Sequence, residues 1–345
     1  MKPMLAHNLV ELVGRTPLLK IPSLSRLSQC DIFVKCEFMN PGGSIKDRAA
    51  LAMVQDAIED GRLKPGMTIV EGTAGNTGIG LAIAAKAFGY KMLVVMPKGQ
   101  TPEKERMITL HGAELLLVDP CPFKDPKHFY HTARRIAEEK PEQYFWANQF
   151  ENLSNFRAHC DFTGPEILQQ MSGRLDALVS ASGTGGTIGG CSAYLKEQLP
   201  DIKVVLADPE GSGLYSYFKT GEFKSEGSSL TEGIGIMRLV ANFAQAKIDT
   251  ALRVTDKQLI TVARYVRDED GIVLGSSSAL NAAAALHTSL QLGPGHRVVT
   301  FACDLGERSY SKLWNADYLK AQKLDEGLPT MGQLVAHYHA ESLGL

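Results

Sequence analysis

Short apolar segments alternate with segments of helical pattern along almost the whole chain. The apolar segments are rich in β-branched residues and predict strands at residues 31–37, 68–71, 91–96, 114–118, 144–147, 175–180, 203–207, 272–274 and 297–303. Between them, helical patterns lie at residues 45–60, 77–88, 103–111, 129–139, 187–198, 257–268 and 278–290. Strands that are apolar throughout are typical of sheets covered on both faces. The pattern therefore predicts an α/β protein with parallel, twisted sheets flanked by helices.

The composition excludes several classes of protein. The 345 residues suggest about two domains, and 36 basic against 38 acidic residues give a net charge of −2, which argues against nucleic-acid binding. No apolar run approaches the length of a membrane helix or of a secretory signal. The six cysteines form no Cys-x-x-Cys pair, so we expect reduced thiols in a cytoplasmic protein. His128 and His131 are spaced like metal ligands but lack supporting residues, so we expect no metal.

Ligands of parallel sheets bind at the carboxyl ends of the strands, so the loops that lead from a strand into a helix carry the information about function. The first unusual loop is 73–78, with the sequence TAGNTG. Free N–H groups at a helix start, together with Thr and Asn side chains, favour an anion. The alternative is a plain N-cap turn.

The second unusual loop is 183–187, with the sequence GTGGT. Its glycines would let the backbone come close to a phosphate, and its two threonines would donate hydrogen bonds. No Gly-Lys-Ser/Thr follows, and Ile188 stands where the dinucleotide fingerprint has its third glycine. ATP, GTP and NAD are therefore disfavoured, and another phosphorylated ligand is implied.

Two further segments combine turn residues with polar side chains. Residues 275–279 (GSSSA) place three hydroxyl groups at a helix start, where they either bind a ligand or cap the helix. In the segment 40–48, Ser44 is a good N-cap and Lys46 falls in the first helical turn, where the helix dipole disfavours a cation. Such a lysine suits a nucleophile or base. The alternative is a solvated lysine that pairs with Asp47 or another nearby acid.

Together these segments resemble the fold-type II pyridoxal-phosphate enzymes, whose fold is like that of the tryptophan synthase β subunit, and within them the cysteine synthase/cystathionine β-synthase family. The resemblance runs from about Leu9 to Trp314. It rests on ELVGRTPL at 11–18, PGGSIKDR at 41–48, TAGNTG at 73–78, QFEN at 149–152, GTGGT at 183–187, EGIG at 232–235, SSS at 276–278 and DLGER at 304–308. Segments 146–150, 211–215 and 231–235 resemble a divergent subgroup that includes fungal-type cysteine synthases and cysteine desulfhydrases.

The resemblance implies roles for individual residues. Lys46 matches the lysine that forms the Schiff base with pyridoxal 5′-phosphate and later moves the substrate α-proton. Asn76 matches the partner of the cofactor's ring hydroxyl, and Ser277 matches the partner of its pyridine nitrogen. The residues that match the phosphate cup are Gly183, Thr184, Gly185, Gly186 and Thr187. Those that match the substrate site are Thr73, Ala74, Gly75, Asn76, Thr77, Gln149 and Gly233.

The activity implied by the resemblance is β-replacement: L-cysteine from O-acetylserine and sulfide, through an aminoacrylate. A second interpretation is a cysteine desulfhydrase, which would release sulfide, pyruvate and ammonia from cysteine. A third is a non-catalytic, cofactor-binding partner subunit, against which the presence of Lys46 argues. Ala74 stands where the family usually has serine, so one substrate contact is lost. The resemblance also implies a homodimer and a serine acetyltransferase as a protein partner.

We expect two domains and a tail. Residues 39–149 would form a smaller, mobile α/β domain with Lys46 and the substrate-carboxylate loop. Residues 1–38 and 150–325 would form a larger α/β domain with the phosphate cup and Ser277. Residues 326–345 would be a C-terminal tail, with a short helix near 331–339 at a dimer contact.

Overall fold

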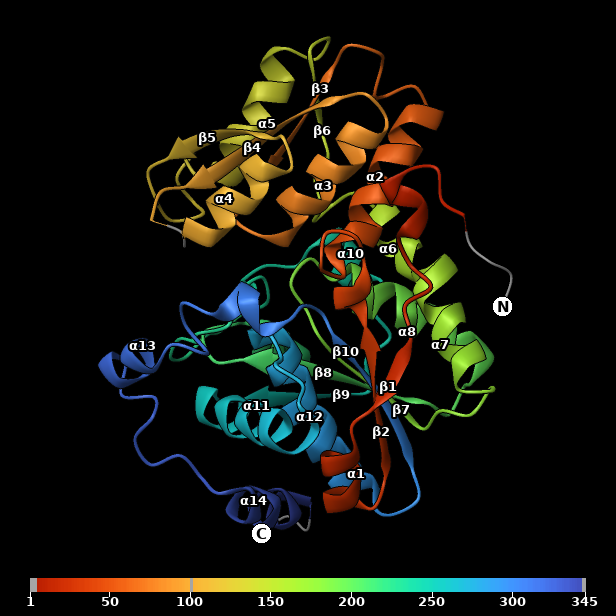
Figure 1. The fold of residues 1–345 in the computed structure, drawn as a ribbon, viewed down its shortest axis with the longest axis vertical. Helices are drawn as coiled ribbons and strands as arrows, with labels where there is room; N and C mark the ends of the chain where they lie inside the picture. The colour runs from red at the N-terminus through yellow and green to blue at the C-terminus, as the bar shows by residue number, and fades with distance from the viewer. Residues whose placement is uncertain (1–4, 100–101, 343–345) are drawn as a thin grey trace.

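The computed structural model describes residues 5–99 and 102–342, and their strands form two separate sheets (Figure 1). The larger sheet has the strand order β1-β2-β10-β7-β8-β9, and the smaller one has the order β5-β4-β3-β6. Within the described residues, every neighbouring pair of strands is parallel except β1 and β2. Helices flank both sheets, so the predicted α/β architecture is confirmed.

The bounds of the elements follow the alternating pattern closely. The strands are β1 Leu18–Lys20, β2 Asp31–Cys36, β3 Thr68–Gly72, β4 Lys91–Pro97, β5 Glu114–Val118, β6 Tyr144–Trp146, β7 Ala177–Ala181, β8 Lys203–Pro209, β9 Thr250–Val254 and β10 Arg297–Ala302. The α-helices are α1 Pro22–Ser28, α2 Lys46–Glu59, α3 Asn76–Ala87, α4 Pro102–Leu110, α5 Phe129–Glu139, α6 Ser154–Ala158, α7 Gly164–Gln170, α8 Gly186–Gln198, α9 Leu214–Thr220, α10 Ala241–Ala244, α11 Asp256–Asp270, α12 Ser276–Leu292, α13 Ala316–Ala321 and α14 Met331–Ser342. Short 3-10 turns are η1 Leu9–Leu12, η2 Glu37–Met39 and η4 Gly306–Ser309, and η3 His159–Thr163 is a π-helical turn.

One predicted strand is wrong, and two edge strands of the larger sheet, β1 and β9, were not predicted; β1 has only three residues. Residues 272–274 form no ladder; they connect α11 to α12, and only Leu274 makes an isolated bridge, to Leu305. These residues are apolar because Leu274 is buried in the core, which a three-residue pattern cannot distinguish from a strand. The edge strand β9 escaped prediction because it is short and Arg253 interrupts its apolar run.

The edge of the smaller sheet also departs from the expectation of strands covered on both faces. Helix α5 packs on β3 and β4, whereas β5 is packed mainly by α4. Leu116 and Leu117, neighbours on opposite faces of β5, are each 39% exposed. An apolar run therefore marks a strand but does not say whether the strand lies at the centre or the edge of its sheet.

Each sheet together with the helices that pack on it is called a unit here, and helix α12 is the most deeply buried helix of the larger unit. Its residues from Ser276 to Leu290 are all buried, and the helix packs against β10, β7 and α11. Its core positions include five alanines, at 279, 282, 283, 284 and 285. Small side chains let neighbouring elements approach closely, which explains why an alanine-rich helix lies at the centre. This packing fixes the hydroxyl groups at its N-terminus against the carboxyl edge of the sheet.

The C-terminal helix α14 packs on the larger unit of its own chain. It lies against α12 and α11, at the lower end of the molecule in Figure 1. The Tyr338 ring stacks on the ring of His287, with 4.2 Å between centroids and 5° between planes, and Leu334 is buried beside it. The predicted helix is confirmed, while its expected place at a dimer contact stays a prediction.

Candidate active site

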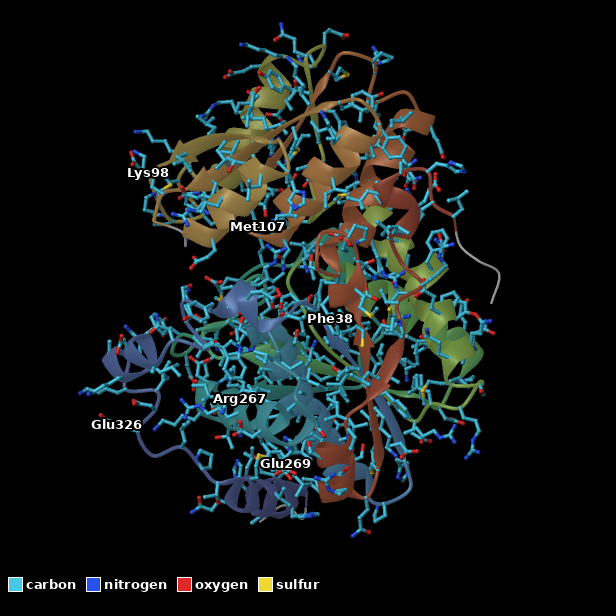
Figure 2. All side chains as sticks on the ribbon, in the orientation of Figure 1. Phe38, Lys98, Met107, Arg267, Glu269 and Glu326 are labelled. Carbon is cyan, nitrogen blue, oxygen red and sulfur yellow. The ribbon has the colours of Figure 1, made fainter. Side chains whose placement is uncertain are left out.

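A cavity of about 810 Å³ lies between the two sheet units. The loops that follow β3, β7 and β10 line it, as expected for the carboxyl ends of parallel strands. Phe38 from the larger unit and Met107 from α4 of the smaller unit also line it (Figure 2). All the predicted site residues line this cavity except Gly186, which opens α8 just behind the wall.

Lys46 is the first residue of α2 and lines the cavity with a half-buried side chain. Among the residues that the structure describes, its Nζ has no hydrogen-bond or ion-pair partner. Asp47 makes no ion pair with it; Asp47 Oδ2 accepts a hydrogen bond from the Gly42 N–H, and Asp47 Oδ1 has no partner among the described residues. The interpretation of Lys46 as a lysine paired with Asp47 is therefore wrong. The turn before α2 is held from the larger unit, where Arg308 Nη2 donates to the Gly42 carbonyl at 2.8 Å.

The loop 73–77 meets Gln149 across 72 residues of sequence. Thr77 Oγ1 donates to Gln149 Oε1 at 2.7 Å. The N–H groups of Asn76 and Thr77 open α3 and have no acceptor within the helix, so they remain for an anion. Ala74 and Gly75 complete the loop without adding a polar side chain.

A buried carboxyl group, that of Glu71, holds the backbone beside Gln149. Its Oε2 accepts from the N–H of Asn148 at 2.7 Å, and its Oε1 accepts from the N–H of Gln149 at 3.4 Å. Asn148 has a φ of +52°, in the left-handed region that asparagine adopts more readily than most residues other than glycine. Burial raises the pKa of Glu71 to about 8, although the two N–H donors oppose the shift.

Glu71 is therefore expected to make stability depend on pH. Between its ordinary pKa of 4.5 and its folded pKa of about 8, the unfolded chain loses the Glu71 proton while the folded chain keeps it, so stability falls as pH rises. The free energy of unfolding in urea should be larger for the native chain than for Glu71→Gln at pH 5. We expect this difference to become smaller as the pH rises towards 8. A difference that stays constant over this range would contradict the assignment.

Asn76 makes a direct contact between the two units. Its Nδ2 donates to Asp304 Oδ2 at 2.8 Å, and Asp304 follows β10 in the larger unit. Asp304 is buried, and its Oδ1 has no partner in the described part of the chain. Burial raises the pKa of this carboxyl. Sequence reasoning assigned no role to Asp304, because its only signal was its place in the DLGER segment.

The loop 183–187 is tightly enclosed by protein. Gly185 has a φ of +89°, and a Cβ there would lie 2.4 Å from the Phe243 backbone. A Cβ on Gly183 would lie 2.1 Å from the Gly233 carbonyl oxygen, and one on Gly186 would lie 2.0 Å from Asn155 Oδ1. These glycines are therefore required by packing within the protein, in addition to any approach of a ligand. The cavity side of the loop presents the hydroxyls of Thr184 and Thr187 and the free N–H groups at the start of α8.

The three serines that open α12 differ in their partners. The Ser278 hydroxyl donates to the Asp304 carbonyl at 2.8 Å, and the Ser276 hydroxyl accepts from the Glu232 N–H at 3.4 Å. Ser277 lies in the cavity wall, to which Cys303 also contributes. Ser276 and Ser277 thus both line the cavity, whereas Ser278 serves the local structure. Gly233, with a φ of +73°, lies on the same wall.

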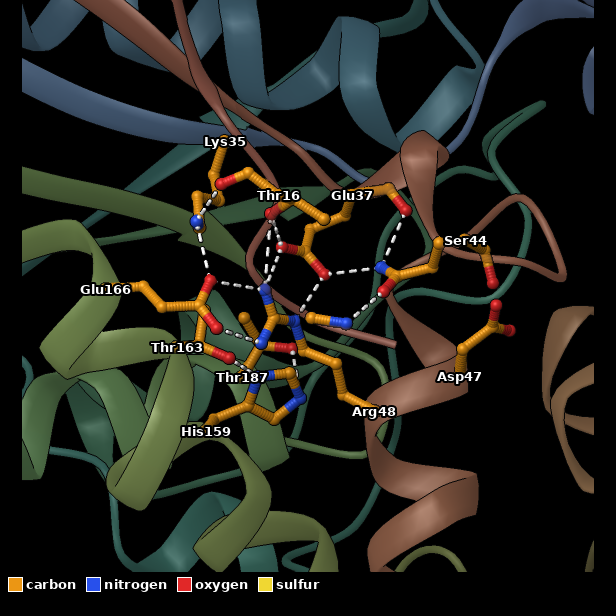
Figure 3. A network of polar contacts seen from close by, with 12 residues as sticks. Thr16, Lys35, Glu37, Ser44, Asp47, Arg48, His159, Thr163, Glu166 and Thr187 are labelled. Carbon is orange, nitrogen blue, oxygen red and sulfur yellow. Dashed lines mark hydrogen bonds and ion pairs between the residues drawn. The ribbon is translucent and has the colours of Figure 1, made fainter. Parts of the chain in front are cut away.

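A buried network of charges lies behind the start of α2 (Figure 3). Arg48 Nε contacts Glu37 Oε2 at 2.7 Å, and Arg48 Nη2 contacts Glu166 Oε2 at 2.7 Å. Lys35 Nζ contacts the same Glu166 oxygen at 2.7 Å. Burial disfavours a charged Glu166, yet Arg48 and Lys35 hold its pKa at about 2. Through Arg48, two residues beyond Lys46, the network ties α2 to η2, β2 and α7.

Residues 5–99 and 102–342 offer neither a cluster of metal ligands nor a helix that could span a membrane. No group of three or more His, Cys, Asp or Glu is arranged to hold a metal ion. His128 caps α5 by accepting from the Tyr130 N–H, and the His131 ring contacts the Phe123 carbonyl. In the same residues, no helix has both the length and the apolar character needed to cross a bilayer.

Comparison with known proteins gives consistent matches over most of the chain. The profile of the family described as "Pyridoxal-phosphate dependent enzyme" matches residues 9–304. The protein named cysteine synthase 2 of Schizosaccharomyces pombe is 45% identical over 340 residues, covering 92% of this chain and 86% of that protein.

Two solved structures are similar in fold and in sequence. The cysteine synthase (OASS) of Entamoeba histolytica has a TM-score of 0.85 and 32% identity, covering 98% of this chain and 97% of that one. A hydrogen sulfide-producing enzyme of Fusobacterium nucleatum has a TM-score of 0.80 and 32% identity, and the match covers 89% of this chain and 99% of that one.

Proposed function

This chain belongs to the family of pyridoxal-phosphate dependent enzymes, and we propose that it is a cysteine synthase, which makes L-cysteine from O-acetylserine and sulfide. The single observation that carries the proposal is the unpaired Lys46 Nζ, which lines the same cavity as the loops 73–77 and 183–187. A relative that is 45% identical over most of the chain bears that name, which supports the choice of reaction.

The donors around the cavity fit pyridoxal phosphate. Its phosphate would lie on the loop 183–187, where two hydroxyls and the N–H groups at the start of α8 suit an anion. Asn76 would contact the ring hydroxyl and Ser277 the ring nitrogen. When bound, the cofactor supplies an electron sink that stabilises negative charge at the substrate α-carbon. A neutral serine at the ring nitrogen makes this sink milder than an aspartate would, which suits expulsion of a β-substituent.

The chain's own residues would then bind the substrate and move its proton. Lys46 Nζ would hold the cofactor covalently until substrate arrives and then take the α-proton, since no other group competes for this amine. Thr73, Asn76, Thr77 and Gln149 would hold the α-carboxylate at the start of α3. We further propose that residues 39–149 move as a unit over residues 1–38 and 150–325 and exclude water from the cavity.

A desulfhydrase remains the second candidate, because one structural neighbour is named a hydrogen sulfide-producing enzyme. In addition, Ala74 lacks the hydroxyl that the resemblance leads us to expect at this position. Loss of that contact would weaken the hold on the substrate and favour elimination over replacement. A non-catalytic subunit, the third candidate, would have no use for Lys46.

Steady-state turnover separates the first two candidates. We expect cysteine formation from O-acetylserine and sulfide to exceed sulfide release from cysteine by at least about tenfold in kcat/KM, measured on the same preparation. The Ala74→Ser variant serves as the matched comparison, and its added hydroxyl should lower KM for O-acetylserine, by up to about tenfold for one hydrogen bond. Faster sulfide release than cysteine formation would establish the desulfhydrase instead.

The cellular setting follows from the same proposal. We propose a cytoplasmic homodimer with serine acetyltransferase as its protein partner. All six cysteines are free in the structure, which supports a reducing compartment.

A further inference from the structure

Both hydroxyls of the loop 183–187 are held from behind by buried side chains of one segment, α6 and the π-helical turn η3. Asn155 Nδ2 donates to Thr184 Oγ1 at 2.8 Å. His159 Nε2 lies 3.3 Å from Thr187 Oγ1 (Figure 3). Asn155 and His159 are each only 2% exposed. Neither lines the cavity, so they act on it through the two threonines.

The surroundings of His159 leave its ring little freedom. Its Nδ1 lies 3.0 Å from Thr163 Oγ1, at the other end of η3. Helix α8 packs closely on its other side, where a Cβ on Gly190 would lie 2.7 Å from the His159 Cβ. Both ring nitrogens therefore have a hydroxyl partner, and π-helical turns of this kind often occur at functional sites.

The ring carries a single proton. Burial lowers the pKa of His159 well below its ordinary value of 6.5, and the nearby charges of Arg48 and Lys46 lower it further, while Glu166 opposes them. A neutral imidazole has one donor and one acceptor, so two tautomers are available. With the proton on Nδ1, the Thr187 hydroxyl would donate to Nε2. With the proton on Nε2, Thr187 accepts and its own proton is free.

A bound phosphate dianion selects between these tautomers because it only accepts hydrogen bonds. We infer that His159 is a positioning residue whose Nε2–H donates to Thr187 Oγ1, so that the Thr187 proton points at the cofactor phosphate. The Thr163 hydroxyl then donates to Nδ1. This inference rests on the proposed placement of the phosphate on the loop 183–187.

Asn155 leaves the hydroxyl proton of Thr184 free for the ligand, as His159 does for Thr187. Its amide also donates to the Gln149 carbonyl at 2.9 Å, so both of its N–H groups are committed. Thr184 Oγ1 therefore accepts from Asn155 and keeps its own proton for the ligand. The two threonine hydroxyls thus become donors by the same arrangement.

Affinity of the cofactor-free chain for pyridoxal phosphate tests the inference. We expect His159→Phe to raise Kd about tenfold, the effect of one hydrogen bond to a charged group. His159→Gln should restore most of the affinity, because its amide nitrogen can take the place of Nε2. His159→Asn, which reaches only the Nδ1 position, should not. Pyridoxal without its phosphate is the matched control ligand, and its affinity should change in none of these variants.

Thr187→Val distinguishes failure of the inference from failure of the proposed site. We expect this variant to lose about tenfold in affinity, and His159→Phe to add nothing to it. If Thr187→Val binds pyridoxal phosphate normally, the phosphate lies elsewhere. If Thr187→Val is weakened while His159→Phe is not, the inference on His159 is overturned and the site stands.

The tautomer of His159 can also be measured directly in the folded native protein. In the ¹⁵N-labelled holoenzyme, the histidine ring signal that disappears in His159→Gln should report the proton on Nε2. A proton on Nδ1 would overturn the inference even if His159→Phe failed to fold.

Discussion

Replacing Lys46 with alanine is expected to lower turnover by about 10³-fold or more, because the amine that attaches the cofactor and moves the α-proton is removed. The variant should also lose the visible absorbance of the attached cofactor. Its stability should stay within about 0.5 kcal/mol of the native chain, since Nζ has no partner among the described residues. Turnover, absorbance and urea unfolding measure the three effects.

An exposed lysine provides the control for this experiment. Lys86, at the end of α3, is exposed, and Lys86→Ala should leave turnover and absorbance unchanged. Borohydride reduction of the native holoenzyme, followed by peptide mass analysis, should locate the cofactor on the peptide that contains Lys46. A reduced cofactor found on a different lysine would refute the assignment.

Replacing Arg48 with methionine should cause the largest loss of stability, about 3–5 kcal/mol. Arg48 is 3% exposed and Glu37 is fully buried, so the substitution leaves the Glu37 carboxylate in the interior without its cation. Glu166 would keep only Lys35 as a charged partner. The free energy of unfolding, measured in urea on the native and variant chains, tests this expectation.

Two further variants show whether the burial of the Arg48 ion pairs causes the expected loss of stability. Arg134 pairs with Glu138 on the exposed face of α5, so Arg134→Met should cost about 0.5 kcal/mol or less. The double variant Glu37→Gln with Arg48→Met should recover part of the loss, because the unpaired charge is gone. Equal losses for Arg48→Met and Arg134→Met would mean that the buried network does not hold α2 to the larger unit.

Local chemistry explains the successes of prediction from sequence. Apolar runs and helical periodicity depend on near neighbours, so most strands and helices were located to within a few residues. Loops between a strand and a helix are equally local, and their Gly, Thr and Asn content marked both sides of the cavity. Prediction failed for residues 272–274 and for the edge strands β1 and β9, where burial and edge position depend on the rest of the fold.

The supporting side chains of the site could not be found in the same way. Asn155 and His159 contact threonines 29 and 28 residues away, and Asp304 contacts Asn76 across 228 residues. In the sequence, Asn155 and His159 are each one polar residue in an ordinary segment, and Asp304 was marked only by its place in the DLGER segment. The signal at Asn155 and His159 was their i, i+4 spacing, which puts both on one helix face but does not say what that face contacts.

The sequence by itself determined the α/β class, the Gly- and Thr-containing loops, the lysine at the start of a helix and, through resemblance, the cofactor family. These features reside in residues close together in the chain. Only the tertiary structure decided that Lys46 is unpaired, that Arg48 is neutralised by Glu37 and Glu166, and that His159 supports Thr187. The physical reason is that hydrogen bonding, charge pairing and burial depend on which distant segments pack together, and local pattern carries no record of those partners.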